Sequence, residues 1–410
     1  MKSHFSAKFF EGNRARLREL FTGTAPIVIT ANGLLQRGGD SSYAFSQDAN
    51  FWYLTGIDEP DITLVMDRDK EYLIVPPRDA SRQAFDGAID DQALTKRSGI
   101  PLIYETEDGW KQLGSRIKKV KHVAVIAASP SYIERYGLYA NPARARLLET
   151  IRSHNEAVEL LDLGMHLVQM RMIKQPAELA AIQEAIDITS AAVRAATTPA
   201  KLAKYAYEYE LEADVARGFR ARGASGHAFE PIVAAGERAC TLHNVANDGP
   251  LEANQLVVID VGAEVEHYAA DITRTICLGK PSRRQRAVHE AVQEVQKFAY
   301  DLLKPGVLMA EYEKQIEMYM GEKLRTLGLI KTIDHDSVRA YYPHATSHFL
   351  GLNVHDAGDY TQPLQPGMVI TVEPGIYIPD EGIGVRIEDD VLITETGIEI
   401  LTDALRRTLD

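Results

Sequence analysis

Aspartates set in hydrophobic, β-branched runs are the feature that most constrains how this chain can fold. In QLVVIDVGAEVEHYAADITRTICLG the run Leu256–Ile259 is typical of a buried strand, and EVEHYAAD allows the chain to turn back into a second strand. The pattern predicts that Asp260 and Asp271 lie on neighbouring strands of one hairpin. A buried carboxylate is costly unless a partner or a metal compensates its charge. Either aspartate alone would indicate a solvated acid at a turn or sheet edge, but the two together favour a site.

Two glutamates and three histidines extend this pattern further along the chain. Glu373 in PGMVITVEPGIYI and Glu388 in GIGVRIEDDVLITETG each follow a hydrophobic run. Between the two pairs of acids, YYPHATSHFLGLNVHD places His344, His348 and His355 within 12 residues, although the whole chain has only 12 histidines. A single histidine is more often a core or surface residue than a ligand. Three of them between acid-bearing strands favour a shared site.

The acids decide which class of metal the site would hold. Four carboxylates in one cleft cannot all stay ionised without compensation, and two divalent cations would neutralise them. An oxygen-rich set with one imidazole suits Mn²⁺, Co²⁺ or a catalytic Zn²⁺, whereas a structural zinc would require thiolates. Two such ions about 3.5–4 Å apart can activate a water and polarise the carbonyl that it attacks. The sequence therefore predicts metal-assisted hydrolysis.

Composition excludes other classes of protein. The chain has 410 residues, 45 Lys and Arg against 58 Asp and Glu, and a formal net charge of −13. Nucleic-acid binding is not expected, because it depends on clustered basic residues. Cys240 and Cys277 are too few for a disulfide framework, and reduced thiols suit the cytosol. Since no run approaches the roughly 20 apolar residues that span a bilayer, we expect a cytoplasmic protein without a membrane partner.

Strand and helix patterns predict two domains of mixed α/β (α+β) class. In the first, Asn13–Phe21 and the stretch from Pro142 to Val158 read as helices. PIVITAN, the two halves of ITLVMDRDKEYLIVPP and KHVAVIAASP read as strands. Long amphipathic helices are then predicted from Pro176 onward and from about Arg286 to Leu303. We place the boundary near residue 165, which gives domains 1–165 and 166–410.

The sequence segments that contain these residues closely resemble those of one family. The segments VIDVGAEVEHYAADITRT, HATSHFLGLNVHD, TVEPGIYI and RIEDDVLIT are similar to those of the pita-bread metallopeptidases, and most of all to aminopeptidase P. The resemblance runs from Arg37 onward. The segment DSSYAFSQDANFWYLTGIDEP (Asp40 to Pro60) resembles part of the family's N-terminal domain. Methionine aminopeptidases lack this domain. It implies an N-terminal α/β domain followed by a pita-bread catalytic domain, with a curved antiparallel sheet flanked by helices.

The resemblance also implies the metal ligands. Asp260 and Asp271 would bind one metal ion, and His348 and Glu373 the other, with Asp271 and Glu388 bridging the two. Mn²⁺ is the expected ion, with Co²⁺ or Zn²⁺ as alternatives. In the family, the acid that corresponds to Glu373 also moves a proton from the water towards the leaving nitrogen, which is chemically reasonable for a carboxylate beside the metals.

Other matched residues would contact the substrate. His243, in CTLHN, and His355 match histidines that bind the substrate and stabilise the oxyanion. Arg386 matches an arginine that contacts the substrate, although a buried ion pair with one of the site's own acids is the alternative. Tyr377 matches a tyrosine that lines the cleft. His344 would either line the pocket or orient a ligand.

Some positions depart from the family pattern. Ala345 stands where a glycine is usual, Asn353 where an aspartate is frequent, and Asn244 where an aromatic residue is common. In RDASRQAFDG, Gln83 and Phe85 replace Glu and Trp. Since the family's aromatic residue can reach a neighbouring subunit's active site, these changes bear on substrate preference and assembly.

The leading hypothesis is a Xaa-Pro aminopeptidase that releases the first residue from peptides with proline in second place. Prolidase, which accepts only dipeptides, shares the fold and ligands and stays an alternative. A creatinase-type amidinohydrolase works without metals and does not suit the retained ligands. An inactive peptide-binding or scaffold protein of this fold is the rival from another class. By analogy with the family we expect a homo-oligomer, either a dimer or a tetramer.

Overall fold

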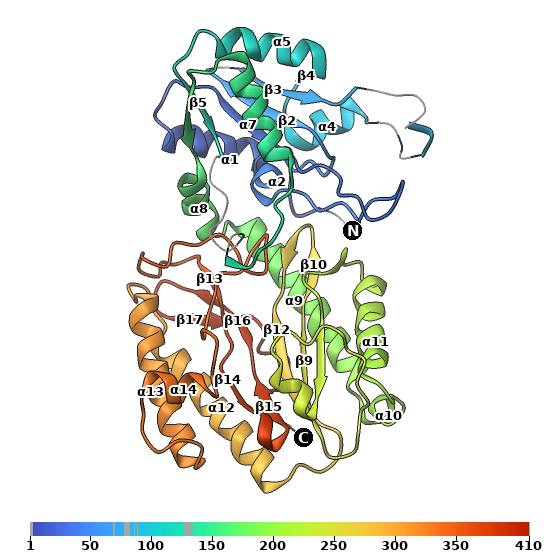
Figure 1. The fold of residues 1–410 in the computed structure, drawn as a ribbon, viewed down its shortest axis with the longest axis vertical. Coiled ribbons are helices and arrows are strands. Elements are labelled where there is room, and N and C mark those ends of the chain that lie inside the picture. Colours follow the sequence, from blue (N-terminus) through green and yellow to red (C-terminus); the bar gives the residue numbers. More distant parts are fainter. Residues whose placement is uncertain are drawn as a thin grey trace. The chain divides into compact units, whose positions relative to one another are not determined.

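The chain folds into two compact units. The computed structural model describes residues 3–68, 70–77, 83–85, 87, 89–126, 133 and 135–409. One unit is formed by Phe5–Met170, and the other by Arg171–Asp410 together with Met1–His4. Figure 1 shows the helices and strands of both units, coloured along the sequence. Each unit has its own sheets and buried side chains.

A six-stranded sheet forms the centre of the unit Phe5–Met170, with the strand order β4-β3-β2-β1-β5-β6. Its strands are β1 (Ile27–Thr30), β2 (Thr63–Asp67), β3 (Lys70–Val75), β4 (Leu102–Glu105), β5 (His122–Val125) and β6 (Glu159–Asp162). β2 pairs antiparallel with β1 and β3, and the other neighbours are parallel. The predicted strands β1, β2, β3 and β5 are confirmed, although residues 127–130 at the end of the predicted KHVAVIAASP strand lie outside the described residues. Strands β4 and β6 at the two edges were not predicted; each is only four residues long, and neither buries a residue fully.

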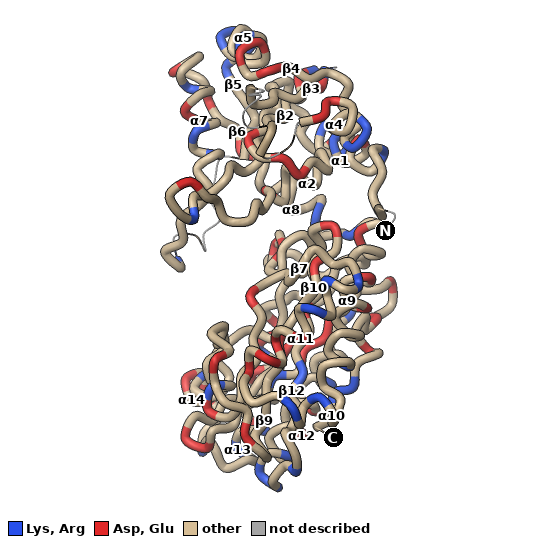
Figure 2. The backbone as a smooth tube through the Cα atoms, turned by 90° about the vertical axis from the view of Figure 1, so that its right-hand side faces the viewer, with Lys and Arg blue, Asp and Glu red and all other residues tan. Residues whose placement is uncertain are grey.

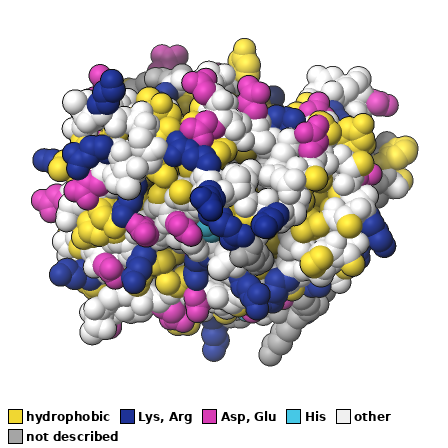
Figure 3. Space-filling view, turned by 90° about the horizontal axis from the view of Figure 1, so that it is seen from below, with side chains coloured by type: hydrophobic (Ala, Val, Ile, Leu, Met, Phe, Trp, Pro, Cys, Tyr) yellow, Lys and Arg dark blue, Asp and Glu magenta, His cyan; other side chains and the backbone are white. Residues whose placement is uncertain are grey.

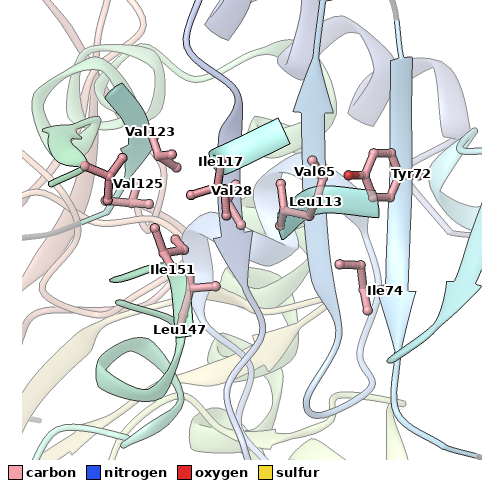
Figure 4. Close-up of a cluster of buried hydrophobic side chains, with 11 residues drawn as sticks. Val28, Val65, Tyr72, Ile74, Leu113, Ile117, Val123, Val125, Leu147 and Ile151 are labelled. Carbon is pink, nitrogen blue, oxygen red and sulfur yellow. The ribbon is translucent and has the colours of Figure 1, made fainter. Parts of the chain in front are cut away.

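Helices lie before, between and after these strands in the chain. They are α1 (Ala7–Leu20), α2 (Ala49–Thr55), α4 (Asp91–Ser98), α5 (Thr106–Ile117), α7 (Ala143–His154) and α8 (Gly164–Met172). Figure 4 shows Leu113 and Ile117 of α5, and Leu147 and Ile151 of α7, directed towards side chains of β1, β2, β3 and β5. Each such side chain contributes about 1.5–3 kcal/mol when it is fully buried. The predicted helices at Asn13–Phe21 and Pro142–Val158 are confirmed as α1 and α7.

Two groups of helices flank the strands of the second unit. The first group is α9 (Pro176–Ala196), α10 (Pro199–Leu202) and α11 (Glu208–Ala221), and the second is α12 (Arg283–Leu302), α13 (Met309–Thr326) and α14 (His335–Arg339). Figure 1 shows the groups on opposite sides of the strands. Pro176 begins α9 as the sequence predicts, and Glu178 closes a capping box with Gln175. The Ser282 side chain caps α12, which therefore begins three residues before the predicted start.

The strands of this unit form four small sheets within the described residues, and all their pairings are antiparallel. The strands are β7 (Gly226–His227), β8 (Ile232–Ala235), β9 (Leu256–Val261), β10 (Ala263–Val265), β11 (Tyr268–Ala269), β12 (Ile272–Cys277), β13 (Val369–Val372), β14 (Gly375–Ile378), β15 (Ile383–Arg386), β16 (Asp389–Ile393) and β17 (Ile398–Ile400). Short 3₁₀ helices, η1 (Gly236–Cys240) and η2 (Pro379–Glu381), lie among them. The predicted fold class is confirmed: a mixed α/β domain precedes antiparallel strands flanked by helices.

Acidic and basic residues are scattered through both units. Figure 2 shows Lys and Arg at separate positions among Asp and Glu along the backbone of each unit. The face in Figure 3 likewise mixes both charges with small hydrophobic groups. Among the described residues, none of the helices combines the length and the apolar character needed to cross a bilayer.

Candidate metal centre

The β9–β12 pair brings the two predicted aspartates to one place. Asp260 lies within β9 and pairs with Thr273 of β12, while Asp271 directly precedes β12. The chain turns at Glu266 and His267, whose φ angles of 46° and 70° are left-handed. Both aspartates are buried, with 8% and 5% of their surface exposed. The predicted hairpin therefore exists, with β10 and β11 extending it beyond the paired strands.

One further hairpin, in which β13 pairs with β16 and β14 pairs with β15, places both glutamates beside these aspartates. Glu373 lies between β13 and β14, and Glu388 lies between β15 and β16. The Glu388 backbone N–H donates to the Thr273 carbonyl at 3.0 Å, and the Thr273 hydroxyl donates to Glu388 Oε2 at 2.6 Å. These bonds tie Glu388 to β12, two residues after Asp271. Strands distant in sequence therefore converge on one cluster of acids.

His348 is oriented by a hydrogen bond to the backbone. Its Nδ1–H donates to the Phe349 carbonyl at 3.0 Å, which leaves Nε2 directed at the acids. Nε2 lies 3.5 Å from Asp271 Oδ2 and 3.4 Å from Glu373 Oε1. One ligand atom each from Asp271, His348 and Glu388 lie within 4.8 Å of one another, so these three residues could hold a metal ion.

The buried carboxylates of the cluster require compensating positive charge. Burial, together with neighbouring acids such as Asp260, raises the pKa values of Asp271 and Glu388 well above their ordinary range. Burial also raises the pKa of Glu373 to about 7, although His348 and Arg386 oppose the shift. Among the described residues, Asp260 Oδ1 is buried without a hydrogen-bond partner. Crowded carboxylates, an orphaned oxygen and a free imidazole nitrogen suit divalent cations, which would replace the protons that these acids otherwise retain.

Arg386 forms the buried ion pair that the sequence left open as an alternative to substrate contact. Its Nη2 donates to Asp260 Oδ2 at 2.6 Å, and its Nη1 donates to the Tyr377 hydroxyl at 2.9 Å. His344 Nε2 lies 2.8 Å from the same hydroxyl. Burial, followed by Arg386, lowers the pKa of His344 to about 3, so this ring is neutral at physiological pH. These contacts join three of the predicted residues to the acid cluster.

The two remaining histidines lie near the same cluster. The rings of His355 and His348 meet edge to face with their centroids 4.3 Å apart. Burial, followed by the charges of His348 and His243, lowers the pKa of His355 to about 4. His243 is exposed in the loop after η1, and its charge acts on both His344 and His355. The ten residues singled out by the sequence therefore all lie in or near one site.

Other contacts at the site had no clear signal in the sequence. Glu313 of α13 accepts hydrogen bonds from the Thr346 N–H at 2.8 Å and from its hydroxyl at 3.0 Å, in the segment that carries His348. Asp390 accepts the Asp271 N–H at 3.1 Å. The acidic run of RIEDDVLIT could have indicated Asp390. Nothing in the sequence connects Glu313 with a residue more than 30 positions away.

The departures from the family pattern fall around the site without removing a ligand. Ala345 does not have a positive φ, so its backbone does not require glycine. The Asn244 Nδ2 group is buried and has no hydrogen-bond partner among the described residues. In the other unit, Phe85 is 87% exposed, and Gln83 is exposed beside it. Residues 78–82 and 86 of RDASRQAFDG lie outside the described residues.

Comparisons with known proteins agree on one family. The family model described as "Metallopeptidase family M24" matches residues 180–395, and "Aminopeptidase P, N-terminal domain" matches residues 10–126. A Xaa-Pro aminopeptidase of Haemophilus influenzae is 33% identical, over 98% of this chain and 95% of its own length. A Xaa-Pro dipeptidase of Pyrococcus furiosus is 37% identical, over 64% of this chain and 72% of its own. The solved structure of a putative aminopeptidase P from Bacillus anthracis, 30% identical, has a TM-score of 0.90 and covers 99% of this chain and 97% of that one.

Proposed function

Because the chain belongs to metallopeptidase family M24 and carries the N-terminal domain of aminopeptidase P, we propose that it is a metal-dependent Xaa-Pro aminopeptidase. It would release the first residue of peptides with proline in second place. The observation that carries this proposal is the buried convergence of carboxylates with the Nε2 atom of His348. The similarity to Xaa-Pro aminopeptidases over nearly the whole chain favours this activity over that of a dipeptidase, whose matched share of the chain is smaller.

Family membership and the cluster of Asp271, His348 and Glu388 indicate divalent metal ions. We propose two of them: Asp260 and Asp271 would bind one, His348 and Glu373 the other, and Asp271 and Glu388 would bridge. The oxygen-rich set with one imidazole favours Mn²⁺, with Co²⁺ or Zn²⁺ as alternatives. When bound, such ions supply Lewis-acid polarisation of the scissile carbonyl and a nucleophilic water at neutral pH.

Glu373 is the residue best suited to move a proton. Burial raises its pKa to about 7, and its Oε1 atom lies close to His348 and accepts a hydrogen bond from Thr371 at 3.3 Å. A carboxylate in this position can accept a proton from water and deliver it to the leaving nitrogen of proline. Bound cations would lower this pKa, which favours release of the proton in the second step.

Neutral histidines would bind the substrate. With pKa values of about 4 and 3, His355 and His344 each carry one ring N–H at neutral pH and can donate a hydrogen bond without adding charge. We propose that His243 and His355 contact the substrate and its oxyanion, whereas His344, Tyr377 and Arg386 line the cleft. Since Arg386 already pairs with Asp260, its first role is to hold that carboxylate in place.

Peptides of different lengths test the activity and separate it from that of prolidase. The metal-stripped protein should cleave neither Xaa-Pro dipeptides nor Xaa-Pro tripeptides, and returning Mn²⁺ should restore cleavage of the tripeptide. Xaa-Ala peptides serve as the matched control, because alanine keeps the amide N–H that proline lacks. Cleavage of the dipeptide alone would identify a prolidase, and unchanged cleavage after stripping would refute the metal-dependent mechanism.

Substitution of Glu373 separates an enzyme from a scaffold. If the protein works through hydrolysis, Glu373→Ala should abolish both cleavage and cellular function; retained function without cleavage would support the scaffold alternative. A homo-oligomer and a cytoplasmic location stay predictions, to be measured by light scattering and cell fractionation.

A further inference from the structure

Four buried charged side chains lie beside the segment that carries His348 and His355. They are Arg171, Lys174, Glu178 and Asp356, exposed to between 1% and 8%. Two cations and two carboxylates cancel one another in formal charge. Buried charges persist only where they are paired and hydrogen-bonded, so this group requires a compensating arrangement.

Asp356 is the centre of this arrangement. One carboxylate oxygen accepts from Arg171 Nη2, and the other accepts from Lys174 Nζ at 3.3 Å. The Asn353 backbone N–H also donates to Oδ1 at 3.3 Å. Burial alone would raise the pKa of Asp356, but the two cations hold it below its ordinary value. A Cβ atom at Gly351 would collide with this carboxylate, so the close approach depends on glycine.

The backbone of Asp356 connects this network with the metal centre. Its N–H donates to the Phe349 carbonyl at 2.8 Å, and the same carbonyl accepts the His348 Nδ1–H at 3.0 Å. That second bond sets the tautomer that leaves Nε2 of His348 facing the acids. Because His355 directly precedes Asp356, whatever holds Asp356 in place also holds the backbone of both histidines.

The network also reaches the strand that leads to Asp271. Glu178 Oε1 accepts from the Tyr268 hydroxyl at 2.9 Å. Burial raises the pKa of Glu178, although the Gln175 backbone N–H and Lys174 oppose the shift. The Ala269 N–H donates to the Gly351 carbonyl at 2.9 Å. The four charges therefore join the start of α9, strand β11 and the histidine segment.

We propose that Asp356, held by Arg171 and Lys174, is a positioning residue for His348 and His355. Through the Phe349 carbonyl it sets the orientation of the His348 ring, and through the chain it fixes the site of His355. The role in catalysis rests on the proposed function, whereas the role in metal binding is measured without any substrate.

The test compares Asp356→Asn with the unsubstituted protein. Asparagine keeps the shape of the side chain, but Glu178 is then the one carboxylate left in the network with the two buried cations. We expect the affinity of the metal-stripped protein for Mn²⁺, measured by calorimetry, to fall by about 10–100-fold, which is typical when an outer partner of a metal ligand is removed. The kcat for a Xaa-Pro tripeptide should fall at saturating Mn²⁺, because His355 is displaced as well.

Three further variants complete the experiment. Asp359→Asn is the matched control, because Asp359 accepts hydrogen bonds from Thr361 and lies outside the network; its Mn²⁺ affinity and kcat should be unchanged. Lys174→Met removes one cation while Arg171 stays, so the Mn²⁺ affinity should fall less, and Lys174→Arg should restore it. Lys174→Met tests the proposal even if Asp356→Asn does not fold.

The outcomes distinguish the two proposals. If either variant, Asp356→Asn or Lys174→Met, folds and binds Mn²⁺ as tightly as the unsubstituted protein, the positioning role is overturned. An unsubstituted protein that binds Mn²⁺ but leaves Xaa-Pro peptides intact would overturn the proposed function, and the comparison of affinities would still decide the role of Asp356.

Discussion

Thr273→Val removes a single hydroxyl beside the proposed bridging ligand. The Thr273 Oγ1–H donates to Glu388 Oε2 at 2.6 Å, and Thr273 Oγ1 itself accepts from Arg386 Nε at 3.2 Å. Valine is close to threonine in shape and suits the buried position in β12, so the strand should persist. The hydrogen bond also lowers the pKa of Glu388 against burial and the neighbouring acids. Its loss therefore makes the proton harder to displace by a metal ion.

The size of the effect follows from the charge on the acceptor. A hydrogen bond to a charged group contributes about 1.5–3 kcal/mol, and about 1.4 kcal/mol corresponds to a factor of ten in affinity. We therefore expect the Mn²⁺ affinity to fall by about 10–100-fold. Arg386 keeps its bonds to Asp260 and Tyr377, so the effect should be confined to the Glu388 side of the site.

The assay is calorimetric titration of the metal-stripped protein with Mn²⁺, and Thr275→Val is the matched control. Thr275 lies two residues further along β12, and its hydroxyl donates to the neutral Arg386 carbonyl at 2.8 Å. The control should lose about 1 kcal/mol of stability without a change in Mn²⁺ affinity. Equal Mn²⁺ affinities in both variants would refute the reasoning that the Thr273 hydroxyl holds a metal ligand.

Three further predictions address the cleft, the acids and the core. Tyr377→Phe removes the hydroxyl shared by His344 and Arg386, so kcat/KM for a Xaa-Pro tripeptide should fall while Mn²⁺ affinity, measured by calorimetry, stays the same; a parallel fall in affinity would contradict this. The folded-state pKa of Glu373, about 7, lies above its ordinary 4.5, so its contribution to the stability of the metal-stripped protein is fully present below pH 4.5 and is lost as the pH rises to about 7. Urea unfolding at both ends of this range checks the sign, and the metal-loaded protein, whose carboxylates are neutralised by cations, should lack the effect. Ile117→Ala opens a cavity in the core of Figure 4 and should cost about 2–5 kcal/mol, seen as a lower urea midpoint, with unchanged Mn²⁺ affinity; a loss of affinity would show that this core supports the site.

The fold was predictable where burial and periodicity coincide. Buried strands such as β2, β3 and β9 and the long helices α9 and α12 carry strong hydrophobic signals, and the structure contains each of them. Edge strands β4 and β6 are only four residues long and bury no residue fully, so their short apolar runs do not by themselves predict a strand. Helix α5 also went unpredicted, although it packs on the core of its unit.

The candidate site was predictable in its residue types but not in its pairings. Acids in hydrophobic strands and clustered histidines indicate a metal centre, since burial of such groups requires compensation. The sequence could not decide whether Arg386 contacts the substrate or an acid; the pairing of β15 and β12 with their neighbours puts it against Asp260. It also offered no reason to connect Glu313 with Thr346.

The amino-acid sequence by itself determined the chemistry available: which side chains can bind a cation, which runs must be buried, and the order in which they occur. Only the tertiary structure decided the partners, such as Thr273 for Glu388 and the two cations for Asp356. The physical reason is the separation along the sequence over which each property acts. Hydrophobicity and ligand type are properties of a residue and its close neighbours, whereas a hydrogen bond between residues more than 100 positions apart depends on the pairing and register of strands and helices.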